Sequence, residues 1–179
     1  MRVTKLLSLM GILVMFGGCA GHSMDTYKDT KPQADIKTYF NGPIKGWGII
    51  QDWRGRVVSR FDVTMVGKWE GDEGTLTENF VYYDTQKTQQ RIWHIKKIAD
   101  GQYEGTASDI LGIAKGETLG SAVRWNYVMD LDVDGSTYRI RFDDWMWAMN
   151  DGVVVNRSYL KKFGFTVAEL TLFMQKQNP

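Results

Sequence analysis

Large apolar residues alternate with polar ones through much of the chain, most clearly between Val123 and Leu131. Every second residue of this segment is large and apolar, while Arg124 and Asp130 occupy the opposite parity. Successive side chains of a β-strand point to opposite faces, so a period of two predicts a strand with one buried face. Asp134-Gly135 follows and predicts a hairpin turn, because glycine tolerates the positive φ that such turns need.

The same alternation, interrupted by turns rich in glycine and aspartate, continues along the chain from about residue 36. It predicts roughly ten antiparallel strands, at 45–53, 56–69, 75–83, 88–98, 102–107, 112–117, 123–131, 137–148, from 153 onwards and at 170–176. No long amphipathic helix is predicted. Strands joined by short turns are typical of a meander that forms a sandwich or a barrel. We favour an all-β barrel of about eight to ten strands, since closure removes exposed edge strands.

A barrel of the bacterial outer membrane is a competing topology, because its strands also alternate apolar and polar residues. Its lipid-facing band has to exclude charge. In this chain, charged residues lie in the middle of the predicted strands, at Arg60, Asp62, Arg139, Arg141 and Asp143. The charges therefore favour a barrel whose outer face lies in water.

The N-terminus has the features of a bacterial lipoprotein signal. Arg2 and Lys5 precede an apolar run of eleven residues, from Leu6 to Phe16, which is shorter than the ~20 residues of a membrane-spanning helix. Two glycines then precede Cys19, the only cysteine of the chain, in an arrangement that resembles a lipobox. We predict a signal peptide at residues 1–18 and lipidation of Cys19, which would attach the protein to a membrane.

The next segment, residues 19–35, is polar and has no periodicity, so we expect a flexible tether before a barrel domain at 36–179. Ala20 stands where an aspartate retains Gram-negative lipoproteins in the inner membrane. Resemblance to that sorting signal therefore favours the cell envelope, at the outer membrane and facing the periplasm.

Composition argues against several classes of function. Lys and Arg number 22 against 21 Asp and Glu, and no basic stripe follows the chain, so a nucleic-acid partner is not expected. His94 is the only histidine of the predicted domain, and metal-ligand spacings such as CxxC or HExxH do not occur. We therefore predict no metal site and no cofactor. Ser108 and Ser121 lack the surroundings of a nucleophile elbow, which argues against a serine hydrolase.

Two carboxylates fall on apolar strand faces. Asp144 has the parity of Phe142, whereas Asp143 lies on the opposite face. Glu78 lies between two apolar residues of its own parity. A buried carboxylate needs a cation or hydrogen-bond donors, and Arg91 is in phase with the apolar residues of its strand. This set predicts either a structural ion pair, an anchor for a ligand head group in an apolar cavity, or paired carboxylates for acid–base chemistry.

For ligand binding, we predict that one set of inward-facing residues lines the cavity. These residues are Trp47, Glu78, Arg91, Trp93, Trp125, Tyr127, Phe142 and Asp144.

Three stretches carry a family resemblance: 40–56 (FNGPIKGWGIIQDWRGR), 112–127 (GIAKGETLGSAVRWNY) and 142–146 (FDDWM). Together with the lipobox, they resemble a family of bacterial lipoproteins called domain of unknown function 3833. The resemblance covers nearly the whole chain and implies a calycin- or lipocalin-like barrel. It implies no catalytic residue, because the family name carries no activity.

These observations favour a lipid-anchored envelope protein whose barrel binds a fatty acid or another small apolar ligand for carriage or handling at the envelope. One alternative is a packed barrel that binds an envelope protein through outer aromatic residues such as Trp145 and Trp147. Another is an enzyme that acts on lipid through Asp144 and Glu78. Catalysis is the least favoured of the three.

Overall fold

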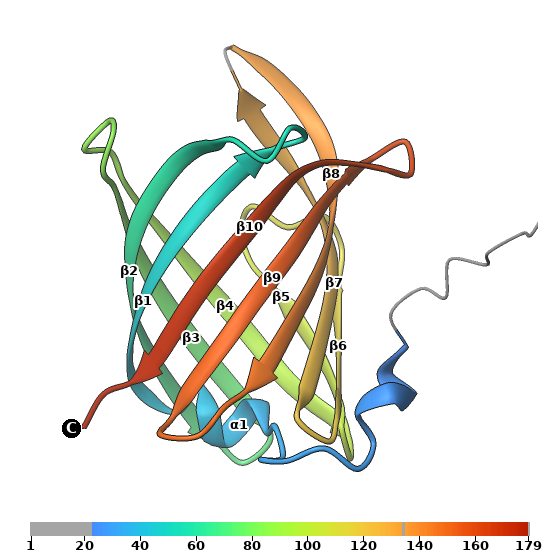
Figure 1. Ribbon diagram of the computed structural model, residues 1–179. Helices are drawn as coiled ribbons and strands as arrows, with labels where there is room; N and C mark the ends of the chain where they lie inside the picture. The colour runs from blue at the N-terminus through green and yellow to red at the C-terminus, as the bar shows by residue number, and fades with distance from the viewer. Residues whose placement is uncertain (1–22, 134, 179) are drawn as a thin grey trace, which may run out of the picture.

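Antiparallel strands follow one another around a closed barrel in the computed structural model (Figure 1). The structure describes residues 23–133 and 135–178, and in these it contains ten strands. The strands are β1 (Gly42–Asp52), β2 (Val57–Glu70), β3 (Glu73–Tyr82), β4 (Thr88–Ala99), β5 (Gln102–Thr106), β6 (Ala114–Leu119), β7 (Ala122–Val133), β8 (Ser136–Ala148), β9 (Val153–Lys162) and β10 (Phe165–Lys176). Each strand pairs with its neighbours in sequence, and β10 closes the barrel on β1. The predicted antiparallel meander barrel is confirmed.

Closure rests on a long ladder between the first and last strands. It runs from Ile44 opposite Lys176 to Asp52 opposite Ala168. The last strand begins at Phe165 rather than near residue 170, and β9 extends to Lys162. Both edges of the sheet are thereby long enough to pair with each other, which leaves no open edge at the seam.

The short helix α1 (Ile36–Tyr39) lies at one end of the barrel, the lower end in Figure 1. Asp35 caps it, because its carboxylate accepts a hydrogen bond from the Thr38 N–H at 2.5 Å. Ile36 and Phe40 are buried in the main core. At the other end of the helix, Lys176 Nζ donates to the carbonyls of Thr38, Tyr39 and Asn41. The helix is thus a plug that is fastened to the last strand.

The segment 23–35 lies against the outside of the barrel before it enters at α1. Its 3-10 helix η1 (Met24–Tyr27) contacts β6 and β7. Thr30 Oγ1 lies 2.8 Å from Ser121 Oγ, and the Ala34 N–H donates to the Gly120 carbonyl at 2.7 Å. The expectation of a flexible tether is therefore wrong for residues 23–35. The predicted signal peptide (1–18) and the predicted lipidation site, Cys19, lie outside the described residues.

The physical reason for this packing is an apolar patch on the outer face of β7 and β8. Trp145 is 1% exposed and Ala122 is fully buried, and both form a small core with Met24. The Tyr27 ring lies 6.0 Å from Trp145 and 6.4 Å from Trp147. Trp145 therefore points outward as predicted, but the chain's own N-terminal segment covers it.

No helix in the described part of the chain is long and apolar enough to cross a membrane.

Candidate functional site

The inner faces of the strands enclose a cavity of about 220 Å³. It extends from Ile36 and Phe40 at the plug towards Ile50, Tyr82 and Leu131 near the other end of the barrel. Sites for drug-sized ligands usually occupy about 300–1,000 Å³. The cavity is therefore of a size for one small or narrow molecule.

Aromatic rings from three strands form a continuous wall of this cavity. The rings of Trp93 and Trp125 meet edge to face at 6.0 Å, and Trp93 meets Tyr127 at 5.4 Å. Tyr127 then stacks on Phe142 at 4.8 Å. All four rings line the cavity, as the parity of β4, β7 and β8 predicts. Such pairs contribute on the order of 1 kcal/mol each beyond the area they bury.

Two glycines set the position of Trp125. A Cβ at Gly116 would overlap its ring, and a Cβ at Gly105 would lie 2.6 Å from the ring edge. Gly116 is the direct cross-strand neighbour of Trp125. The indole therefore lies flat over bare backbone, and glycine is needed there for close approach rather than for a turn.

Trp47 does not line the cavity, and this prediction is wrong. Its side chain is 41% exposed on the outer face, with its ring 6.0 Å from that of Phe173. The inward parity of β1 belongs to Gly46 and Gly48, both buried. At Gly48, the ring of Phe61 fills the space that a side chain would occupy. The assumption that the larger residue faces inward fails where a neighbouring strand supplies the bulk.

Arg91 is the only cationic side chain among the described residues that line the cavity. Its Nε donates to both carboxylate oxygens of Asp109, at 2.9 and 3.1 Å, and its Nη2 lies 2.8 Å from Asp109 Oδ2. The predicted partner, Glu78, lies farther away, with Oε2 3.8 Å from Nη1. Arg91 therefore faces two carboxylates, and the sequence pattern did not predict the closer one, Asp109.

Glu78 lies in the cavity wall without a full set of partners. Its Oε2 atom is shielded from water and has no hydrogen-bond partner among the described residues. Burial raises the pKa of Glu78 to about 6, although the charge of Arg91 and the indole of Trp93 act in the opposite direction. Removal from water penalises the charged form of a carboxyl, and a cation at 3.8 Å offsets only part of that cost.

Asp144 is the second poorly satisfied carboxylate of the cavity. The Tyr127 hydroxyl donates to Oδ2 at 3.1 Å, while Oδ1 has no hydrogen-bond partner within the described chain. Burial raises the pKa of Asp144 to about 7, against the lowering effect of the Ser158 and Tyr127 hydroxyls and of Arg91. Burial also raises the pKa of Tyr127 well above its ordinary value, so its hydroxyl remains a donor.

Comparison with known families shows which family the chain belongs to, but that family has no assigned activity. A model of the family described as "Protein of unknown function (DUF3833)" matches residues 13–176. The chain belongs to the DUF3833 family. A search of the curated proteins found no match. For this DUF3833 barrel, the cavity and its polar groups are therefore the basis for an assignment of function.

Two polar residues of the DUF3833 cavity were missed by the sequence reasoning. Asn156 and Ser158 on β9 are 4% and 2% exposed and line the cavity. Ser158 is the cross-strand neighbour of Asp144. Ser158 Oγ donates to Asn156 Oδ1 at 3.4 Å, and Asn156 Nδ2 donates to the Trp145 carbonyl at 3.0 Å. Their alternation with Leu160 is a signal that places them on the inner face.

Asp109 gave no comparable signal, because it lies in the loop between β5 and β6. Its neighbour Ile110 forms an isolated bridge with Met129 of β7, which holds the loop over the inner face. Loop residues have no periodicity to reveal where they point.

His94 is exposed on β4. Residues 23–133 and 135–178 contain no group of three or more side chains arranged to hold a metal ion.

Proposed function

We propose that this DUF3833 protein is a lipid-anchored envelope protein whose barrel binds one small apolar or amphiphilic molecule, such as a fatty-acid-like lipid, for carriage or handling at the envelope. The observation that carries the proposal is the cavity of about 220 Å³ inside a closed barrel, with an aromatic wall and a few buried polar groups. Apolar walls with a small number of polar groups are typical of small-molecule sites.

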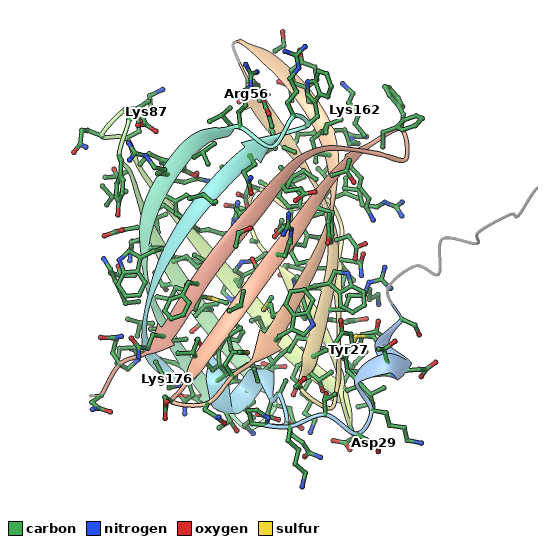
Figure 2. The ribbon with its side chains drawn as sticks, in the orientation of Figure 1. Tyr27, Asp29, Arg56, Lys87, Lys162 and Lys176 are labelled. Carbon is green, nitrogen blue, oxygen red and sulfur yellow. The ribbon has the colours of Figure 1, made fainter. Side chains whose placement is uncertain are left out.

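The ligand enters from the end of the barrel opposite α1. The plug closes one end, near Lys176 in Figure 2, whereas Arg56, Lys87 and Lys162 mark the hairpins of the other end. The hairpins at this end also carry exposed apolar side chains, among them Trp53 (70% exposed) and Phe163 (89% exposed). Exposed apolar loops support exchange of a ligand with an apolar surface such as a membrane.

Calorimetric titration tests this function. The full chain carrying Cys19→Ser, which offers no thiol for lipidation, is titrated with octanol, octylamine and octanoate. We expect at least one of the three to bind with saturation, one molecule per chain. Met129→Trp fills the cavity and should abolish that binding, whereas Val66→Trp adds the same ring at an exposed position of β2 and should leave it unchanged. Absence of saturable binding for all three probes in the folded chain would overturn the proposal.

The anchor and the location are part of the same proposal and rest on the residues around Cys19. The test is metabolic labelling with an alkyne-tagged palmitate, followed by separation of inner and outer membranes. We expect label on the protein in the outer-membrane fraction and no label on Cys19→Ser. Label that survives the substitution, or recovery of the labelled protein with the inner membrane, would contradict this assignment.

A further inference from the structure

Two buried carboxylate oxygens of the cavity wall have no hydrogen-bond donor among the described residues. Oε2 of Glu78 and Oδ1 of Asp144 are both shielded from water, and neither has a hydrogen-bond partner among residues 23–133 and 135–178. Both side chains line the cavity, Glu78 from β3 and Asp144 from β8. Buried polar atoms are normally paired, so two unpaired acceptors in one cavity wall are a departure that calls for an explanation.

The nearby donors are already engaged. The Tyr127 hydroxyl donates to Asp144, the Ser158 hydroxyl has Asn156 and Asp144 as its two acceptors, and Asn156 donates to a backbone carbonyl. A ligand head that only accepts hydrogen bonds would have to displace one of these contacts. A head that donates hydrogen bonds meets acceptors with unused capacity.

Arg91, the one cation among the described residues of the cavity wall, is engaged as well. Arg91 makes a two-oxygen contact with Asp109 and also faces Glu78. A carboxylate or phosphate entering the cavity would meet a guanidinium whose Nε and Nη2 are already paired with Asp109, and at Nη1 it would approach the carboxylates of Glu78 and Asp144. Like charges brought together in a poorly solvated site repel strongly.

We propose that the cavity selects a ligand whose polar head donates hydrogen bonds and is neutral or cationic, such as a hydroxyl, an amide or an ammonium group, and that it rejects anionic heads. Glu78 and Asp144 are the residues that discriminate. This inference rests on the proposed function, since it names the class of molecule that the barrel binds. It also narrows that function, because an ionised fatty acid is then a poor ligand and its hydroxyl, amide or amine relatives are good ones.

The test compares three eight-carbon probes that share a tail and differ in their heads. Octanol, octylammonium and octanoate are titrated into the full chain carrying Cys19→Ser at about pH 8.5, above the raised pKa values of Glu78 (about 6) and Asp144 (about 7), so that both carboxyls are ionised. We expect octanol and octylammonium to bind at least about tenfold more tightly than octanoate. Glu78→Gln and Asp144→Asn keep the shapes of the side chains and remove their charges, so each should reduce the preference for octylammonium over octanoate.

Asp143→Asn is the matched control, because Asp143 is the adjacent residue and lies on the outer face of β8, where Arg124 and Lys161 contact it. It should leave the order of the three probes unchanged. Octanoate binding as tightly as octanol would overturn this inference and still support a binding barrel. A preference that survives in both Glu78→Gln and Asp144→Asn would overturn the assignment to these residues. Absence of binding by every probe would instead overturn the proposed function itself.

Discussion

Asp143 and Asp144 are consecutive residues of β8, are 6% and 8% exposed, and differ in almost every other respect. Asp143 points to the outer face, where Arg124 Nε lies at 2.8 Å and Lys161 Nζ at 2.7 Å. Burial acts to raise its pKa, but these two hydrogen bonds outweigh that effect and hold the pKa below its ordinary value. Asp144 points into the cavity and has the Tyr127 hydroxyl as its bonded donor. Burial there raises the pKa to about 7.

The difference shows that the exposed fraction of a carboxyl does not by itself decide the direction of its pKa shift. On the outer face, long cationic side chains from the neighbouring strands reach a buried carboxylate and keep their own heads partly in water. On the inner face, every cation must itself be buried, and Arg91 is already paired with Asp109. The outer face therefore pairs the buried Asp143 with two cations, whereas the inner face leaves Glu78 and Asp144 each with an oxygen that has no donor among the described residues.

The largest expected effect is on the pH dependence of stability, measured with Asp144→Asn. The folded chain keeps the Asp144 proton up to about pH 7, whereas the unfolded chain loses it near pH 4. The unfolded state therefore binds fewer protons in this window, and the free energy of unfolding falls as the pH rises. Urea denaturation should show the variant gaining about 4 kcal/mol relative to the original chain between pH 4 and pH 8. A difference that does not change with pH would contradict the raised pKa.

A smaller effect of opposite sign is expected for Asp143→Asn. The substitution leaves Arg124 and Lys161 without their common carboxylate and should lower the free energy of unfolding at pH 7 by about 2 kcal/mol. Because the folded pKa of Asp143 is depressed, its stabilisation is present above about pH 4 and is lost as the pH falls further. Urea midpoints measured from pH 7 down to pH 3 check this. A loss of stability of the same size at every pH from 7 to 3 would point to packing rather than charge.

The smallest effect is expected for Asp130→Asn, also on the outer face. Asp130 accepts two hydrogen bonds from Arg139, at 3.0 and 3.2 Å, but the Arg139 side chain is 70% exposed. Water and salt screen such a pair, and most exposed ion pairs contribute little. The urea midpoint of this variant should coincide with that of the original chain. A clear drop would mean that outer-face pairs stabilise the barrel even when they are exposed, and the contrast with Asp143 would then weaken.

Period-two alternation predicts the meander because each strand has one face in the core. It places Trp125, Tyr127 and Phe142 correctly for that reason. It fails at Trp47, where the inward parity carries glycine and Phe61 from β2 fills the space. It also fails for residues 23–35, because a polar segment can pack on an apolar patch that only the folded barrel creates.

The protonation and hydrogen bonding of the buried carboxyls are harder to predict from the sequence than the fold is. Parity places Glu78 and Asp144 inside, but the identity of their partners depends on a loop residue, Asp109, and on the cross-strand register of Ser158. Whether a buried oxygen is bonded depends on distances of a few tenths of an ångström. A pattern of residue types does not contain that information.

The chain runs along the outside of the barrel before it enters as the plug, and this has a mechanical consequence. A pull applied at residue 23 first meets the packing of Met24 and Tyr27 on Trp145, and then the contacts of Thr30 with Ser121 and of Ala34 with Gly120 at the turn between β6 and β7. The plug behind these contacts is held independently by Lys176 of the last strand. A pull on residue 23 would therefore have to break contacts with the barrel wall before it reached the helix that closes the floor of the cavity.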